Sequence, residues 1–244
     1  MYGMRIDKYL TKYLDVESRS KAQQLIESGC VAVDGILVHH PSYDVKKGAN
    51  VEVKKADNFV SRGAYKLLGA IVDFGLNFKN KVVLDIGSST GGFTQVALLN
   101  NAKHIYCVDV GTEQLHPSLR GNERITLYEN TNLKDIELTM FKTKINIILA
   151  DLSFISLTAL LNKVTKLFDY HVTLVVLIKP QFELSKEIVD KCKGVIKLPN
   201  LHQKAVDKVI DHARKLGFNI IKVAESSILG KDGNKEFFAH LEWK

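Results

Sequence analysis

Three aspartates and one lysine each end a short apolar run, and together they could act on a hydroxyl group. These residues are Asp85, Asp109, Asp151 and Lys179. A lysine at the end of a buried strand has to be paired or functional, because an unpaired buried charge is costly. Asp151 is its expected partner. An ammonium near a hydroxyl lowers the pKa of that hydroxyl, and a carboxylate orients the lysine or accepts the proton.

Two further charged residues could reach the same place. Lys66 lies on an expected helix over residues 61–74, just before the first strand of the main sheet. Glu236 begins the last expected strand and could orient a lysine. The alternative for Glu236 is a plain charge at a strand edge, and a single acid at a strand end is often only a cap.

The apolar runs alternate with helix-like stretches, which predicts a largely parallel, doubly wound α/β sheet. The carboxyl ends of parallel strands share one edge, so the charged residues that end them should converge on one crevice. A long helix is expected over residues 202–216, closed by Gly217. The expected strands cover residues 81–86, 104–110, 125–128, 145–150, 172–178, 219–224 and 236–243.

The stretch Lys81–Phe93, KVVLDIGSSTGGF, joins the first of these strands to a loop of small residues. Its glycines let a ligand approach the backbone closely, because no Cβ is in the way. The spacing differs from the GxGxxG of dinucleotide-binding loops, and DxGxxxGGF resembles the first motif of S-adenosylmethionine-dependent methyltransferases. A tight turn in another α/β protein is the alternative. Asp109, about twenty residues beyond the loop, suits the ribose hydroxyls of an adenosyl ligand.

Residues 1–54 have the pattern of a separate small α+β module. Helices are expected over 5–14 and 22–27, with Gly29 ending the second, and strands over 31–33, 36–38 and 50–53. The Asp34-Gly35 pair between two apolar runs is a strong hairpin signal. The motifs RxDKYL, SRSKAQQLI and GxVxVDG resemble the small RNA-binding domain shared by a ribosomal protein, pseudouridine synthases and tyrosyl-tRNA synthetases. The RNA contacts that this resemblance implies are Arg5, Lys8, Arg19 and Lys21, and a solvated charged helix face is the alternative.

The composition favours an anionic partner. The net charge is +7 and the pI is about 9.1, which makes nucleic acid the leading candidate, although basic proteins without any polyanionic partner also occur.

The three cysteines lack zinc or CxxC spacing, so no metal site is expected and a reducing cytoplasm is favoured. We expect no signal peptide, because the N-terminus is charged and has no apolar h-region. We also expect no membrane partner, because the longest apolar run, Val172–Ile178, is too short to cross a bilayer. The sequence carries no signal for an oligomeric state.

Motifs along almost the whole chain resemble the TlyA family of bacterial rRNA 2′-O-ribose methyltransferases, also named haemolysin A, whose catalytic part is of the FtsJ/RrmJ type. In order they are SRGAYKL, DIGSSTGGFTQ, VDVGTEQL, NTNLKD, ADLSFISL, LIKPQFE and GNKEFFAHL. The resemblance implies an RNA-binding domain at 1–54, a linker at 55–60 and a Rossmann-like methyltransferase domain at 61–244. It also implies a catalytic tetrad of Lys66, Asp151, Lys179 and Glu236.

The activity implied by this family is methyl transfer from S-adenosylmethionine to the 2′-hydroxyl of a cytidine in ribosomal RNA. The favoured substrate is 23S rRNA in the 50S subunit, and 16S rRNA is also possible. Lys179 would stabilise the developing alkoxide, Asp151 would hold Lys179, and Lys66 and Glu236 would position the nucleotide and the lysine. Arg62 is a further expected RNA contact. The expected donor-binding residues are Asp85, Gly87, Ser89, Thr90, Gly91, Gly92, Phe93, Asp109, Asn132 and Asp151.

The chain departs from the family pattern at Ser88, Gln95, Glu113 and Lys134, which leaves the tetrad intact. Two other classes of function stay open. One is a membrane-active haemolysin, against which the lack of a spanning or strongly amphipathic basic segment argues. The other is a non-catalytic ribosome-assembly factor, against which the intact tetrad argues.

Overall fold

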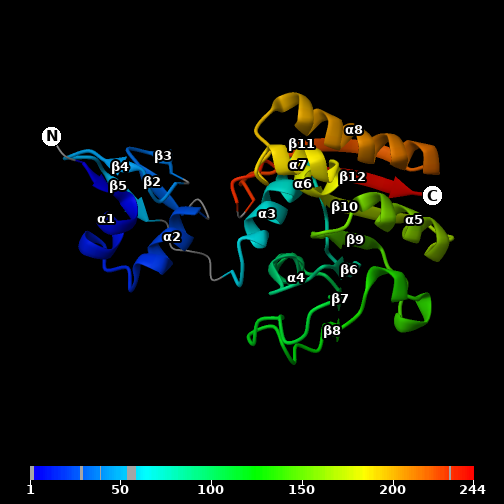
Figure 1. Ribbon diagram of the computed structural model, residues 1–244. Coiled ribbons are helices and arrows are strands. Elements are labelled where there is room, and N and C mark those ends of the chain that lie inside the picture. Colours follow the sequence, from blue (N-terminus) through cyan, green and yellow to red (C-terminus); the bar gives the residue numbers. More distant parts are fainter. Residues whose placement is uncertain (1–2, 28–29, 39, 54–58, 231) are drawn as a thin grey trace. The chain divides into compact units, whose positions relative to one another are not determined.

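The computed structural model describes residues 3–27, 30–38, 40–53, 59–230 and 232–244 (Figure 1). By its internal contacts the chain divides into two compact units, Met1–Phe59 and Val60–Lys244. Most of the expected linker at 55–60 lies outside the described residues, so its boundaries stay a prediction.

The N-terminal unit packs two helices with short strands. Helix α1 (Ile6–Tyr13) and helix α2 (Arg19–Glu27) contact each other, and Ile6, Leu10 and Ile26 are fully buried. Strands β2 (Val31–Val33), β3 (Ile36–Leu37) and β5 (Val51–Val53) form an antiparallel sheet in the order β3-β2-β5. Asp34 and Gly35 both have positive φ, 50° and 80°, as a tight hairpin turn requires. Gly29, expected to end α2, lies outside the described residues.

A second pair of strands in this unit was not expected from the sequence. Strand β1 (Met4–Arg5) pairs in antiparallel fashion with β4 (Asp44–Val45). Strands of two residues are too short to show the alternation of apolar and polar residues by which a strand is recognised. The pair places Arg5 at the start of α1, where its side chain meets that of Asp7.

The larger unit is built on one seven-stranded sheet in the order β11-β12-β10-β9-β6-β7-β8. Five strands are parallel: β6 (Val82–Ile86), β7 (His104–Val108), β8 (Ile125–Tyr128), β9 (Ile147–Ala150) and β10 (Val172–Ile178). Strand β12 (Phe237–Trp243) is antiparallel to both β10 and β11 (Asn219–Glu225). The predicted doubly wound α/β fold is therefore confirmed, with the last two strands added as an antiparallel pair.

Helices cover both faces of this sheet (Figure 1). Helix α3 (Gly63–Phe74) packs against α4 (Gly92–Leu99), and α5 (Leu157–Leu167) packs against α8 (Pro199–Leu216). The short helices α6 (Pro180–Glu183) and α7 (Lys186–Lys191) follow β10. Single-turn 3-10 helices cover Leu133–Asp135 and Leu138–Met140.

Alternation along β6 assigns its side chains to the two faces of the sheet. Val82, Leu84 and Ile86 belong to the apolar core that α5 and α8 complete. Asp85 is on the opposite face and contacts α4. Strands β6, β7, β9 and β10 are buried along most of their length, which explains why they appear in the sequence as continuous apolar runs.

Candidate functional site

Two lysine–carboxylate pairs lie at the carboxyl edge of the parallel strands. Lys179 Nζ is 2.6 Å from Asp151 Oδ1, and Lys66 Nζ is 2.6 Å from Glu236 Oε2. Asp151 follows β9 and Lys179 follows β10, and these strands are neighbours. The pairing of Ile178 with the first residue of β12 brings Glu236 to the same edge. Glu236 thus pairs with the lysine of α3, a match that the sequence left open.

The Lys179 ammonium has further contacts that the sequence did not reveal. Its Nζ donates to Ser153 Oγ at 3.0 Å and lies 5.8 Å from the centre of the Phe182 ring. The lysine is only 9% exposed, so its charge depends on these neighbours and on Asp151. Ser153 belongs to the ADLSFISL motif, but only the folded chain shows that its hydroxyl meets the lysine.

Phe154 is the most unusual residue of this loop. Its side chain is 91% exposed, and its φ is 65°, a left-handed conformation that is rare for a bulky residue. Its ring lies 5.1 Å from that of Phe182, centre to centre. An exposed aromatic side chain held beside the two ion-paired residues can receive a flat ligand.

Glu183 anchors the far end of the same loop. The Glu183 carboxylate, 3% exposed, accepts hydrogen bonds from Ser156 Oγ at 2.5 Å and from Leu157 N at 2.7 Å. These bonds place a negative charge at the N-terminus of α5, where the helix dipole favours it. The loop between Asp151 and Ser156 is therefore fastened at both ends.

Asp85 lies beneath the glycine loop rather than in open contact with solvent. It is fully buried, and Thr94 Oγ1 donates to its Oδ2 at 2.6 Å, which ties β6 to α4. Burial raises the pKa of Asp85 to about 7, against the opposing effect of the Thr94 hydrogen bond. Its Oδ1 is buried without a hydrogen-bond partner within the described part of the chain.

Asp109 fastens two loops at the ends of β6 and β7. Its Oδ2 accepts from Ser89 N and its Oδ1 accepts from Gly111 N, both at 2.8 Å. Each carboxylate oxygen keeps a second lone pair for a hydroxyl donor. Asn132, in contrast, is exposed, and its Oδ1 accepts from Lys134 N at 3.2 Å, so it caps the following 3-10 helix.

The three glycines of the loop serve different purposes. Gly87 has a φ of 80°, and a Cβ there would come within 2.9 Å of the carbonyl oxygen of Asp151. A Cβ at Gly92 would overlap Ser61 Oγ and come within 2.9 Å of Ala64 N. Gly92 is therefore needed for the close packing of α4 against α3. Gly91, with a φ of 92°, would place a Cβ 2.5 Å from Leu119, so it too is constrained by the chain itself.

The cationic residues expected to contact RNA differ in their surroundings. Lys8 and Lys21 are exposed. Arg5 and Arg19 each form an ion pair with the buried Asp7 at 2.9 Å. Arg62, in the larger unit, is partly buried and donates from Nη2 to the carbonyl oxygen of Leu229 at 2.7 Å, which ties it to the loop before β12.

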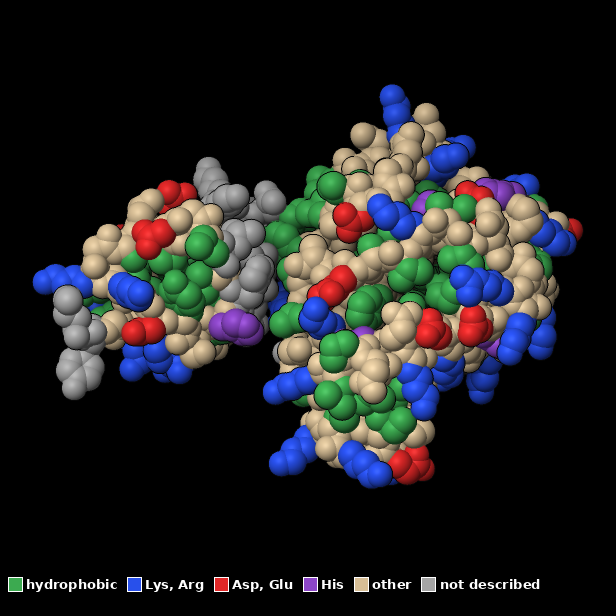
Figure 2. All heavy atoms as spheres, turned by 90° about the horizontal axis from the view of Figure 1, so that it is seen from above, with side chains coloured by type: hydrophobic (Ala, Val, Ile, Leu, Met, Phe, Trp, Pro, Cys, Tyr) green, Lys and Arg blue, Asp and Glu red, His purple; other side chains and the backbone are tan. Residues whose placement is uncertain are grey.

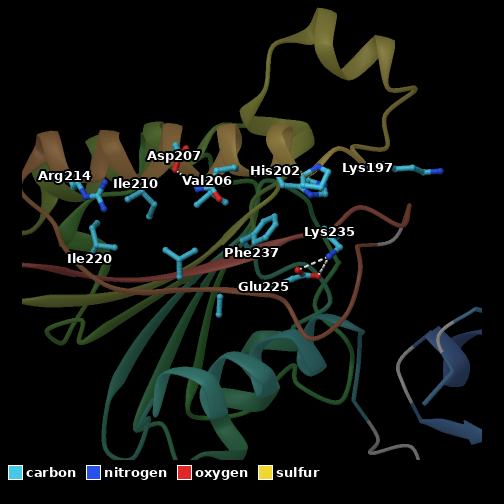
Figure 3. A pocket seen from close by; sticks show the side chains of 14 residues that line it. Lys197, His202, Val206, Asp207, Ile210, Arg214, Ile220, Glu225, Lys235 and Phe237 are labelled. Atoms are coloured by element: carbon cyan, nitrogen blue, oxygen red, sulfur yellow. Dashed lines mark hydrogen bonds and ion pairs between the residues drawn. The ribbon is translucent and has the colours of Figure 1, made fainter. Parts of the chain in front are cut away.

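A separate pocket of about 590 Å³ lies between α8 and the β11–β12 pair (Figure 3). Val206, Ile210 and Ile220 are among its apolar lining residues, and the Lys235–Glu225 ion pair lies at one end. Neither the glycine loop nor the two lysine–carboxylate pairs line it. The chemistry of the strand ends is therefore located elsewhere.

Two further observations concern metals and membranes. Within the described ranges, no group of three or more His, Cys, Asp or Glu side chains is placed to hold a metal ion. Among the same residues, no helix has the length and apolar character needed to cross a membrane.

Comparison with known proteins gives matches over both units. The profile of the family described as FtsJ-like methyltransferase matches residues 59–243, and that of the S4 domain matches residues 4–51. Hemolysin A of Brachyspira hyodysenteriae is 40% identical over 98% of this chain and 99% of its own.

Two curated relatives have names that state an activity. The 23S rRNA (cytidine-2′-O)-methyltransferase TlyA of Campylobacter jejuni is 39% identical over 96% of this chain and 98% of its own. The 16S/23S rRNA (cytidine-2′-O)-methyltransferase TlyA of Mycobacterium tuberculosis (strain CDC 1551 / Oshkosh) is 36% identical over 97% of this chain and 89% of its own.

Proposed function

This chain belongs to the FtsJ-like methyltransferase family, and we propose that it methylates the 2′-hydroxyl of a cytidine in ribosomal RNA with S-adenosylmethionine as donor. The observation that carries the proposal is the Lys179–Asp151 ion pair at 2.6 Å, at the ends of two neighbouring parallel strands. The glycine loop lies directly beside it, because Gly87 approaches the Asp151 backbone. A group that activates a hydroxyl thus adjoins a loop of the kind that binds the donor.

The residues of the loop fit S-adenosylmethionine. The close approach of Gly87 to Asp151 leaves no room for a side chain there, and Asp85 Oδ1 is buried beneath the loop without a hydrogen-bond partner among the described residues. When bound, the donor supplies a methyl group activated by a positively charged sulfur. Asp109 is assigned to the ribose hydroxyls and Asn132 to the adenine region. The full set assigned to the donor is Asp85, Gly87, Ser89, Thr90, Gly91, Gly92, Phe93, Asp109, Asn132 and Asp151.

Lys179 is the proposed catalytic residue. An ammonium has three N–H donors, and those of Lys179 meet Asp151 and Ser153, which leaves one for the 2′-oxygen of the substrate. A positive charge aimed at the oxygen stabilises the alkoxide as its proton leaves, and this effect is strong where water is excluded. The remaining task is alignment of the oxygen with the methyl carbon. Lys66 and Glu236 form an ion pair without net charge, and this pair positions the nucleotide.

Phe154 is assigned to the base of the target nucleotide. Proteins that recognise RNA by sequence read bases that are splayed out of helices and stacked on aromatic side chains. The exposed ring of Phe154 lies three residues after Asp151, in the same loop. The base would stack on Phe154 while the 2′-hydroxyl faces Lys179.

The preferred substrate in this proposal is 23S rRNA in the 50S subunit. The Campylobacter relative, whose name gives 23S alone, is 39% identical to this chain, and the Mycobacterium relative, whose name gives 16S and 23S, is 36% identical. Lys and Arg side chains are spread over the face of the larger unit drawn in Figure 2, which suits an anionic substrate. A ribosomal substrate also assigns the protein to the cytoplasm.

The proposal is tested by transfer of a tritiated methyl group to purified 50S subunits, 30S subunits and naked rRNA. We expect label on 50S subunits that disappears in a Lys179→Ala variant whose donor affinity is intact. Label on both subunits would contradict only the preference for 50S. No label on any substrate, with donor binding intact, would contradict the enzymatic function and favour an assembly factor. Leakage of a dye from liposomes would instead support the haemolysin alternative.

A further inference from the structure

Asp7 in α1 holds two arginines through one buried carboxylate. Arg5 donates from Nε to Oδ1 at 3.1 Å and from Nη2 to Oδ2 at 2.9 Å. Arg19, from α2, donates from Nε to Oδ2 at 2.9 Å, and Gln23 Nε2 donates to the same oxygen at 3.3 Å. Lys8 N donates to Oδ1 at 2.9 Å. The Asp7 side chain is completely buried, and the hydrogen bonds from Arg5 hold its pKa well below the usual range.

The two guanidinium groups are held by one edge only. Both arginines meet Asp7 through Nε, with Nη2 added for Arg5, so their remaining N–H groups are directed to no other residue in the described part of the chain. The side chain of Arg5 is 44% exposed and that of Arg19 is 51% exposed. Their exposure spares both arginines the cost of desolvation and leaves their other N–H groups accessible to a ligand. This pair leaves both cations open to solvent.

We propose that Asp7 is a positioning residue that presets Arg5 and Arg19 as a site for the phosphodiester backbone of RNA. The inference rests on the proposed RNA substrate and deepens it. Guanidinium groups bind phosphate with two parallel N–H donors, a geometry that an ammonium cannot supply. A side chain already fixed before binding loses less conformational freedom when the ligand arrives.

The carboxylate also sets the charge of this site. With one negative and two positive charges, the group keeps a net charge of +1, so it attracts a phosphate without placing two unscreened cations side by side. The exposed Lys8 and Lys21 lie on the same two helices and add charge without fixed geometry. We therefore expect RNA affinity to depend on the planar shape of the arginine side chains and not on their charge alone.

The test exchanges arginine and lysine at matched positions. Arg5→Lys and Arg19→Lys keep the charge and remove the planar group, and Lys186→Arg and Lys204→Arg make the opposite change at exposed positions of the larger unit, outside the proposed site. RNA affinity is measured with a 23S rRNA transcript over a range of salt concentrations, and donor affinity by calorimetry. We expect about a tenfold loss of RNA affinity for each arginine variant, with the salt slope unchanged because the charge is kept. The lysine variants and the donor affinity should stay within about twofold of wild type.

A second control removes a bond to Asp7 without touching either arginine. Gln23→Ala should leave RNA affinity within about twofold, because both guanidinium groups stay in place. An equal loss in Gln23→Ala and in the arginine variants would mean that Asp7 only joins the helices, and the proposal would be wrong. Arginine variants that bind RNA like wild type would also overturn it.

A measurement on the wild-type chain tests the proposal without any variant, so a variant that fails to fold does not prevent the test. With arginines labelled by ¹⁵N, the Nε–H signals of Arg5 and Arg19 should exchange slowly with water before RNA is added, and their Nη signals should shift on binding. Fast exchange, like that of free arginine, would refute a preset site. Methyl transfer is recorded separately: a wild type that binds RNA through these arginines but transfers no methyl group would contradict the proposed enzyme and leave this site standing.

Discussion

Replacing Lys179 with methionine removes the charge at the proposed catalytic position and keeps most of the side-chain volume. Loss of one donor to a developing oxyanion typically costs about 3–4 kcal/mol, which is a factor of roughly 10²–10³ in rate. Lys179 is 9% exposed and is the group that meets Asp151 at the strand ends, so water can replace it poorly. We therefore expect the rate constant of methyl transfer, at saturating donor and RNA, to fall by about 10²–10³.

The same change also affects stability, and this effect can be separated from the chemistry. Removing one partner of a buried ion pair costs about 3–5 kcal/mol, and because the Asp151 side chain keeps 22% exposure we expect about 2–3 kcal/mol here. The double variant Lys179→Met/Asp151→Asn leaves no unpaired charge. It should regain most of the stability but none of the activity.

Single-turnover transfer of a tritiated methyl group to 50S subunits gives the rate, urea unfolding gives the free energy of unfolding, and calorimetry gives the donor affinity. Lys66→Met is the matched control, since it breaks the other pair, Lys66–Glu236, at the same 2.6 Å. We expect it to raise the RNA concentration needed for half-maximal rate more than it lowers the maximal rate. A Lys179→Met variant within threefold of the wild-type rate, or a double variant with restored activity, would refute the reasoning.

Three further predictions concern the surrounding residues. Burial raises the pKa of Asp85 from 3.8 to about 7, so between these values the folded chain holds a proton that the unfolded chain releases. The free energy of unfolding should therefore fall as pH rises from about 4 to 7, by about 4 kcal/mol at most, and Asp85→Asn should remove that slope in urea titrations. Gly92→Ala should destabilise the donor-free protein by about 1–3 kcal/mol through its clash with Ser61 and α3, and an unchanged melting curve would mean that the glycine serves only the ligand. Phe154→Ala should weaken the apparent affinity for 50S subunits about tenfold without loss of stability, and an unchanged affinity would argue against base stacking.

The sequence predicted the sheet and the strand-end residues because parallel strands, buried on both faces, leave continuous apolar runs that end in polar groups. The sequence could not show which residues that are far apart in the chain contact each other in the fold. Lys66 and Glu236 are far apart in the chain, and they meet because α3 carries Lys66 to the sheet edge where the pairing of β10 with β12 places Glu236. Ser153 and Phe154 were missed because a motif shows neither which hydroxyl meets a lysine nor which aromatic ring stays exposed.

In the N-terminal unit, too, the sequence identified individual residues but not the contacts between them. Arg5 and Arg19 could be singled out as cations on two neighbouring helices, but their common partner could not. Asp7 is a charged residue in a helix and would ordinarily be expected at the surface. Its complete burial depends on three donor side chains, those of Arg5, Arg19 and Gln23, and on the backbone N–H of Lys8, and a local pattern does not contain that information.

The left-handed backbone conformation of Phe154 lowers the stability of the fold, whereas the exposed ring serves the proposed recognition of the RNA base. A bulky residue held in that conformation costs about 1–3 kcal/mol, and a ring that is 91% exposed recovers almost nothing by burial. Glycine would fit the same turn without strain. In a library screened only for melting temperature, glycine should therefore be enriched at this position, and the selected proteins should be more stable but less active. Thermostability engineering of this chain should leave this loop untouched.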